Sequence, residues 1–214
     1  MPFASVLFDL DGTLTDPAVG ITRSVQYALR AFGVEESDRA RLVSFIGPPL
    51  EQSFRELYGF SPEQAKQAVA CYRVYFRGTG IWENKLYPGV RDMLQTLQNA
   101  GKTLLVASSK PEIFVRQILE HFGLAPYFAF AGGSELDGRR VQKDEVIRYV
   151  LERSGANPRT AAMVGDRRHD VRGARKNGLA SIGVLYGYGG RDELLAAGAD
   201  KLADSVAQLT GLLL

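Results

Sequence analysis

The sequence predicts a doubly wound α/β fold, a parallel sheet with helices on both faces, accompanied by a smaller all-helical domain. Short apolar runs without polar alternation, which suit strands buried on both faces, alternate with amphipathic helical patterns. A long segment near the N-terminus breaks this rhythm and carries only helical patterns. Several apolar runs end in acidic, hydroxyl or basic side chains, as expected at the ligand-binding edge of an open parallel sheet.

Six apolar runs are predicted to be the strands: Ala4–Phe8, Thr103–Ala107, Tyr127–Ala131, Ala161–Val164, Ser181–Leu185 and a weaker run, Lys201–Ala203. Apolar stripes and end signals predict the helices between them. These helices run from Pro88-Gly89 to Gly101, from Pro111 to Gly123, over Lys143–Arg153, near Val171–Lys176 and over Ser205–Leu213. Alternation of this kind favours a Rossmann-like sheet.

Residues 16–86 are predicted to form the separate helical domain, so that the α/β core comprises residues 1–15 and 87–214. Asp16 is expected to be the N-cap of the first helix of this domain, with Pro17 in its first turn. Ser61 and Gln64 have the spacing of a capping box at the start of a later helix.

Composition excludes several classes of protein. The net charge of +2 over 214 residues is too small for a clustered basic face, so no nucleic-acid polymer is expected as a partner. Cys71 is the only cysteine, which excludes an internal disulfide. No apolar run approaches the roughly 20 residues that span a membrane, and no leader pattern opens the sequence. We therefore expect a cytoplasmic protein, a monomer or a homodimer, without a membrane partner.

The string FDLDGTLTD, from Phe8 to Asp16, ends the first apolar run with clustered acids. Asp9 and Asp11 would repel each other and lose hydration unless a cation or a shared proton neutralised them. Mg²⁺ suits such oxygen ligands. Gly12 allows a sharp turn that turns backbone N–H groups toward an anion, and Thr13 adds a hydroxyl donor. A plain turn is the alternative interpretation of Asp-Gly alone.

Two other predicted strands end in polar residues. Ser108, Ser109 and Lys110 follow one strand and precede a helix, which predicts a phosphate site, although serine before a helix is often only a cap. Asp166 and Asp170 follow another strand, and capping of the next helix by Asp166 is the alternative there.

In order and spacing, these segments resemble the haloacid dehalogenase (HAD) superfamily of phosphohydrolases. Asp9–Asp16 matches the first motif, DxDGTLxD, and Gly165-Asp166 with Asp170 matches the fourth, GDxxxD. Ser108 matches the second motif, and Lys143, at the start of a predicted helix, resembles the lysine of the third. The helical segment after the first motif is similar to the type 1 cap of this superfamily.

The resemblance implies a Mg²⁺-dependent phosphatase. Asp9 would be the nucleophile and form an aspartyl phosphate, while Asp11 would act as general acid and then general base. The metal would be held by the Asp9 carboxylate, the Asp11 backbone carbonyl and Asp166, with support from Asp170. Lys143 would offset the charge of Asp9.

The substrate is expected to be a small phosphorylated metabolite. Ser108 and Lys143 would hold its phosphoryl oxygens, with Thr13, Ser109 and Lys110 as further candidate contacts; Lys110 could instead cap the sheet edge. Within the superfamily the chain looks like the phosphoglycolate phosphatase and 5′-nucleotidase branch. The segments that carry this likeness are Phe45–Leu50, Tyr87–Val90, Ser108–Pro111 and Gly183–Gly189. In the first of them, Gly47 and Pro48 either close over the leaving group or form a turn between cap helices.

Three alternatives accompany this interpretation. A dehalogenase is disfavoured because that branch normally lacks the second aspartate, whereas Asp11 is present. Phosphoryl transfer like that of β-phosphoglucomutase shares the motifs and the cap. A non-catalytic binding module is disfavoured because the Gly-rich stretch Gly183–Gly190 lacks the GxGxxG spacing and no motif residue is missing.

Overall fold

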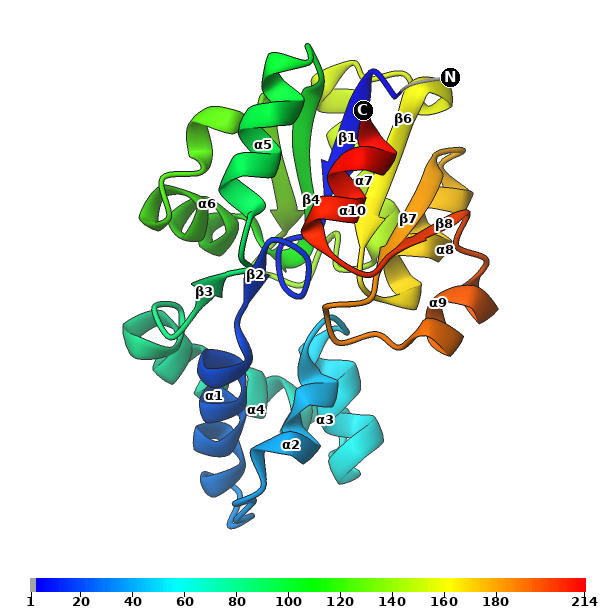
Figure 1. Cartoon of the computed structure of the whole chain (residues 1–214). Helices are drawn as coiled ribbons and strands as arrows, with labels where there is room; N and C mark the ends of the chain where they lie inside the picture. The colour runs from blue at the N-terminus through cyan, green and yellow to red at the C-terminus, as the bar shows by residue number, and fades with distance from the viewer. Residues whose placement is uncertain (1–2) are drawn as a thin grey trace. The chain divides into compact units, whose positions relative to one another are not determined.

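The computed structural model describes residues 3–214 and divides the chain into two compact units (Figure 1). One unit joins the residues up to Asp16 with Leu86–Leu214, and the other is Pro17–Lys85. The chain passes between the units at two short strands that pair with each other, β2 (Thr15–Asp16) and β3 (Lys85–Leu86).

The first unit is built on a sheet of six parallel strands in the order β5-β4-β1-β6-β7-β8. Their bounds are β1 Ser5–Phe8, β4 Thr103–Pro111, β5 Phe130–Ser134, β6 Ala161–Gly165, β7 Ala180–Val184 and β8 Lys201–Ala203. The central strands consist mainly of buried apolar residues. The predicted doubly wound parallel sheet is confirmed.

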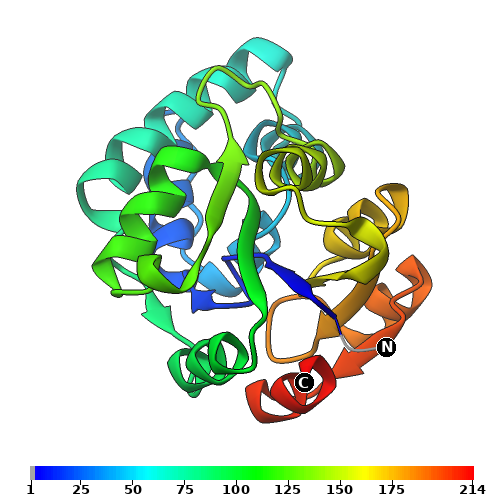
Figure 2. The same cartoon turned by 90° about the horizontal axis from the view of Figure 1, so that it is seen from above.

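Helices cover both faces of this sheet, which explains why its strands lack polar alternation. Two of them, α7 (Lys143–Ser154) and α8 (Arg168–Lys176), lie on one face, and α5 (Val90–Asn99) and α10 (Val206–Leu213) lie on the other (Figure 2). The remaining helices of the unit are α6 Glu112–His121, α9 Arg191–Ala197 and the 3₁₀ turns η3 Ala125–Tyr127 and η4 Pro158–Thr160. Helix α9 was not predicted from the sequence.

Strand register brings the polar strand ends to one level. Phe8 of β1 pairs with Val106 of β4 on one side and with Val164 of β6 on the other. The residues that follow these three therefore lie side by side at one edge of the sheet, and the amide of Asp9 donates to the Val164 carbonyl at 2.9 Å. The chain goes from β1 to β4 and β5 on one side and then crosses to β6 on the other side of β1. The strand order therefore reverses between β1 and β6, and open α/β sheets bind ligands at such a point.

One strand boundary differs from the prediction in a way that matters for the site. Strand β4 was expected to stop at Ala107, but it continues to Pro111, and its pairing with β5 shifts register over this stretch. Ser108–Lys110 therefore lie on an irregular strand end, while helix α6 begins only at Glu112. The helix predicted to open at Pro111 begins one residue later, but the residues before it are part of the strand, because the bulge extends β4.

The second unit is helical. Its helices are α1 Ala18–Arg30, α2 Arg39–Leu42, η1 Val43–Phe45, α3 Leu50–Tyr58, α4 Pro62–Tyr75 and the π-helix η2 Phe76–Gly80. The capping box at Ser61 and Gln64 is confirmed, since both of its hydrogen bonds are present. The predicted cap at Asp16 was wrong: Pro17 occupies the N-cap position of α1, and Asp16 instead accepts a hydrogen bond from the Tyr188 hydroxyl.

Aromatic rings and a close helix contact hold the second unit together. Phe54 lies between Phe45, with ring centroids 4.9 Å apart, and Phe60, at 5.8 Å. Helix α1 approaches the π-helix so closely at Gly20 that a Cβ there would lie 1.9 Å from the carbonyl oxygen of Gly80. Among residues 3–214, no helix combines the length and the apolar character needed to cross a membrane.

We predict that Gly20→Ala lowers the free energy of unfolding by about 1–3 kcal/mol, because the added methyl group forces the two helices apart. Gly78→Ala is the matched control, since a Cβ at Gly78 meets nothing within 4 Å. Denaturant unfolding of both variants measures the difference. Equal stability of Gly20→Ala and the unsubstituted protein would contradict this packing.

Candidate active site

Two carboxylates leave the sheet directly after β1. Asp9 and Asp11 are 4% and 8% exposed, and the turn after them closes through the carbonyl of Leu10, which accepts from the amides of Leu14 and Thr15 at 2.9 and 3.0 Å. Both acids are thus held inside the first unit, where water scarcely reaches them. Their charges therefore need compensation inside the protein.

Lys143, the first residue of α7, compensates one of them. Its Nζ lies 2.8 Å from Oδ1 of Asp9, 2.8 Å from Oδ1 of Asp170 and 3.1 Å from the carbonyl oxygen of Ala107. Burial by itself would lower the pKa of this lysine, but Asp170 and Asp9 outweigh it, so its pKa lies above the ordinary value. Lys143 is therefore a permanent buried cation whose three donors are all engaged.

A third carboxylate completes an acidic cluster. One oxygen each of Asp9, Asp166 and Asp170 lie within 4.8 Å of one another. Burial, followed by the charges of Asp170 and Asp9, raises the pKa of Asp166 well above its ordinary value. Burial also raises the pKa of Asp170, to about 6, against the opposing effect of Lys143.

The cluster fits a hard divalent cation. Asp166 is completely buried, and its Oδ1 atom has no hydrogen-bond partner among the described residues, while Oδ2 accepts from the amide of Tyr188 at 2.7 Å. A buried carboxylate oxygen without a partner is costly unless a cation binds it. Oxygen-only ligands of this kind suit Mg²⁺.

Glycines make room for Asp166. A Cβ at Gly12, where φ is +82°, would lie 2.2 Å from Oδ2 of Asp166, and one at Gly189 would lie 1.8 Å from its carbonyl oxygen. A Cβ at Gly187 would lie 2.4 Å from the Asp166 Cβ. The Gly-rich stretch after β7, which matched no dinucleotide motif, thus lets the chain wrap closely around this carboxylate.

Asp170 is fixed by the start of α8. Its Oδ2 accepts from the amide of Arg167 at 3.0 Å, and Arg167 is the N-cap residue. Glu193 of α9 accepts from Arg167 Nε at 3.0 Å and from the amide of Arg168 at 2.9 Å. The alternative in which Asp166 caps this helix was wrong, because Arg167 is the N-cap residue and the Asp166 carboxylate accepts from the amide of Tyr188 instead.

A second lysine lies on the other acid of the β1 turn. Nζ of Lys110 is 2.7 Å from Oδ2 of Asp11, and the Lys110 side chain is only 6% exposed. Burial raises the pKa of Asp11, and Lys110 partly offsets this. Ser108 is buried beside this pair, and its Oγ accepts from the amide of Lys110 at 3.4 Å, while Ser109 is partly exposed.

Tyrosines border the β1 turn on its other side. The Tyr186 hydroxyl donates to the carbonyl of Thr13 at 3.1 Å, and its ring meets that of Tyr87 edge to face at 5.0 Å between centroids. Thr13 is completely buried, and no described residue is a hydrogen-bond partner of its hydroxyl. Thr13 therefore offers an unused donor at the level of the acids.

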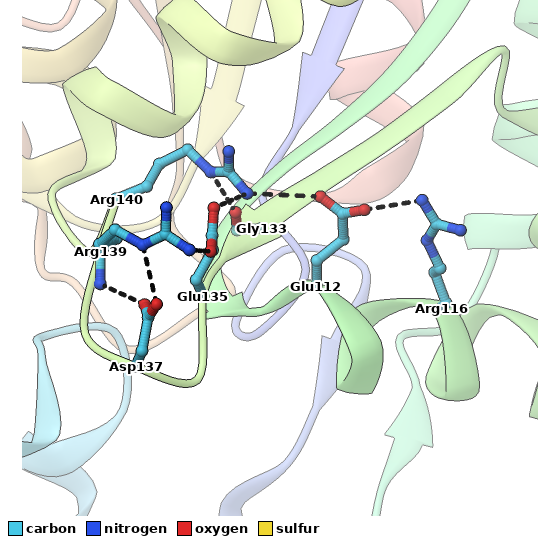
Figure 3. Close-up of polar contacts among 7 residues, drawn as sticks. All are labelled: Glu112, Arg116, Gly133, Glu135, Asp137, Arg139 and Arg140. Carbon is cyan, nitrogen blue, oxygen red and sulfur yellow. Dashed lines mark hydrogen bonds and ion pairs between the residues drawn. The ribbon is translucent and has the colours of Figure 1, made fainter.

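The loop before Lys143 is anchored by Arg140, which adopts a left-handed backbone with φ 55° (Figure 3). Its Nε donates to the carbonyl of Gly133 at 2.8 Å, and its Nη2 lies 3.5 Å from Glu135 and 3.8 Å from Glu112. Its guanidinium carbon also lies 3.6 Å from the ring centroid of Tyr149 on α7. Arg140 thus connects the ends of β4 and β5 to the helix that carries Lys143.

The structure brings most of the predicted site residues together at one edge of the sheet: Asp9, Asp11, Thr13, Ser108, Lys110, Lys143, Asp166 and Asp170. Gly47 and Pro48 belong to the helical unit, in the turn between η1 and α3, where Gly47 has φ 104°. The sequence reasoning missed the amide of Tyr188, the carboxylate of Glu193 and the Arg140 anchor. Of these three, only Tyr188 lies in a stretch with a recognisable sequence feature, the glycines on either side of it.

We predict that Asp166→Asn stabilises the metal-free protein by about 1–3 kcal/mol at neutral pH, because it removes an uncompensated buried charge. The raised pKa means that folding favours the protonated carboxyl, so the stability lost to this charge grows as pH rises. The advantage of the variant should therefore shrink as pH falls. Denaturant unfolding with a chelator present, at several pH values, measures it; a variant less stable at neutral pH would argue against this account.

Comparison with known proteins places this geometry in a family. Residues 6–184 match the family model of haloacid dehalogenase-like hydrolases. A 5′-nucleotidase from Pseudomonas aeruginosa is 51% identical over 91% of this chain and 88% of its own length. A phosphoglycolate phosphatase from Vibrio vulnificus is 31% identical over 98% of this chain and 95% of its own. The tyrosine-protein kinase PtkA of Mycobacterium tuberculosis is 38% identical over 87% of this chain, which spans only 64% of that protein.

A solved structure agrees with the fold. The crystal structure of a predicted phosphatase from Clostridium acetobutylicum superimposes with a TM-score of 0.97 at 48% identity, covering 99% of this chain and 98% of that one. The resemblance inferred from the motifs is thus confirmed. The chain belongs to the haloacid dehalogenase-like hydrolases, and it is a phosphomonoesterase of that family.

Proposed function

We propose that this phosphatase hydrolyses a small phosphate ester through an aspartyl-phosphate intermediate, with Mg²⁺ as cofactor. One observation carries the proposal. Asp9 and Asp11 lie two residues apart, yet each contacts a different lysine, so the two carboxylates have different surroundings. Environments that differ in this way allow one acid to attack while the other transfers a proton.

In the first step, an oxygen of Asp9 attacks the phosphorus atom and the bond to the leaving oxygen breaks. Asp11 gives its proton to that oxygen, so the product leaves as an alcohol. The pKa of Asp11 is raised by burial, which supports the presence of this proton. In the second step, Asp11 takes a proton from water, the water oxygen attacks phosphorus, and the acyl-phosphate bond breaks to restore Asp9 and release inorganic phosphate.

Mg²⁺ would be held by the carboxylates of Asp9 and Asp166 and by the backbone carbonyl of Asp11, with Asp170 in support. Bound there, it would neutralise negative charge on the phosphoryl oxygens. The unpartnered oxygen of Asp166 supports this assignment. Asp170 would also keep Lys143 in place, since the two are in contact.

The phosphoryl oxygens would be held by residues around Asp9. Ser108 and the unused hydroxyl of Thr13 offer neutral donors, and Lys143 offers a cation beside the nucleophile. Catalysis would then consist mainly of positioning and charge neutralisation. Ser109 is a further candidate contact.

We further propose a nucleoside 5′-monophosphate as the substrate, because the 51% identical relative is named as a 5′-nucleotidase. Phosphoglycolate is the nearest alternative within the same reaction, given the relative of that name. A phosphoryl transfer that returns the group to a sugar, as in β-phosphoglucomutase, would use the same core residues.

We predict that Asp9→Asn lowers kcat by about a thousandfold or more while the fold is kept, because the amide cannot form the acyl phosphate. Phosphate release measures activity, and thermal unfolding checks the fold. Asp92→Asn, at an exposed position on α5, is the matched control and should keep full activity. A folded Asp9→Asn protein with retained activity would refute the assignment of the nucleophile.

The proposed substrate and metal can be tested with the unsubstituted protein. Phosphate release is expected to be fastest with nucleoside 5′-monophosphates, slower with phosphoglycolate and sugar phosphates, and abolished by a chelator until Mg²⁺ is restored. The same screen should include β-glucose 1-phosphate with detection of its isomer. Isomerisation without phosphate release would favour the mutase alternative, and full activity in the chelator would contradict the role of the metal.

A further inference from the structure

Lys110 is a charged residue of the site whose contact differs from its expected role. It was a candidate for binding the phosphate, yet its Nζ lies 2.7 Å from Oδ2 of Asp11. We propose that Lys110 is a positioning residue that orients the Asp11 carboxyl group for proton transfer to the leaving oxygen. This inference rests on the proposed role of Asp11 as general acid.

The two carboxyl oxygens of Asp11 have different contacts. Oδ2 contacts Lys110, whereas Oδ1 is buried and has no hydrogen-bond partner in residues 3–214. The contact of Lys110 Nζ with one oxygen limits rotation of the Asp11 carboxyl group, and both side chains are shielded from water. The other oxygen is then left in a defined position for the substrate.

The strand that carries Lys110 is irregular at its end. Strand β4 pairs regularly with β5 up to Ala107 and again at Pro111, and the register shifts between these two positions. Irregularities of this kind redirect side chains at the edge of a site. Lys110 lies within this stretch, and its backbone amide reaches Ser108 Oγ at 3.4 Å. The irregular strand end thus presents a lysine to Asp11.

The two lysines of the site contact different acids. Lys143 lies between Asp9 and Asp170, at the nucleophile, and already provides a cation beside the place of attack. Lys110 contacts the carboxylate two residues further along, which belongs to the leaving side of the reaction. Loss of Lys110 should therefore affect departure of the alcohol more than attack on phosphorus.

This predicts a dependence on the leaving group. An alkyl phosphate needs a proton on its leaving oxygen, whereas p-nitrophenolate leaves readily as an anion. In Lys110→Met, kcat/KM for glycerol phosphate should fall about tenfold to a hundredfold more than kcat/KM for p-nitrophenyl phosphate, since a displaced proton donor costs rate only where the proton is needed. Lys110→Arg, which keeps the cation, should recover part of the loss. Lys201→Met, on the edge strand β8, is the control for removal of an exposed lysine and should change neither value.

A double variant completes the test. Because Lys110 acts through Asp11, Asp11→Asn combined with Lys110→Met should be no slower than Asp11→Asn alone. If Lys110→Met loses activity equally on both substrates, and does so again in the Asp11→Asn background, the inference is overturned and Lys110 returns to phosphate binding. Unchanged kinetics of a folded Lys110→Met protein would overturn it as well. Asp11→Asn alone reports on the proposed function: equal losses on both substrates would remove the acid role of Asp11, and the inference with it.

Discussion

The arrangement of this protein depends on holding several carboxyl groups close together in a place that water scarcely reaches. Asp9, Asp166 and Asp170 gather their oxygens within 4.8 Å, and such a cluster opposes folding unless cations balance it. Lys143 provides one permanent positive charge. Asp166 is not in contact with this lysine, and burial and the charges of the neighbouring acids raise its pKa. A buried cluster that remains short of positive charge has the oxygen ligands that suit a divalent cation.

The fold gathers these charges with short connections. The three strands at the centre of the sheet are in register at Phe8, Val106 and Val164, so the polar residues that follow meet without long loops. Gly12, Gly187 and Gly189 then let the backbone approach Asp166 more closely than any side chain would allow. Hydrogen bonds from Tyr188 and Arg167 orient the two aspartates that follow β6. Rigid support of this kind is what catalysis by positioning requires.

The fold and most of the site were predictable because their signals are local. Uninterrupted apolar runs identified the parallel strands, and the acids after two of them identified the site. The missing parts depend on contacts between distant segments. Glu193 reaches Arg167 from helix α9, and Asp16 meets Tyr188 instead of capping a helix. Such partners have no spacing rule in the sequence, because tertiary packing alone decides them. The extension of β4 to Pro111 was missed for a related reason: proline and the serines before it usually signal a turn, but a bulge accommodates them at a strand end.

The two lysines give neighbouring acids in one turn different surroundings. Asp9 and Asp11 share a short segment, so the backbone of that segment cannot by itself distinguish their environments. The distinction comes from two other parts of the unit: the start of α7 brings Lys143 to Asp9, and the end of β4 brings Lys110 to Asp11. Arg140 connects these parts, since it contacts Glu112 just after β4 and Tyr149 on α7. The difference between the two acids is therefore a property of the unit as a whole, although the acids themselves are read from nine consecutive residues.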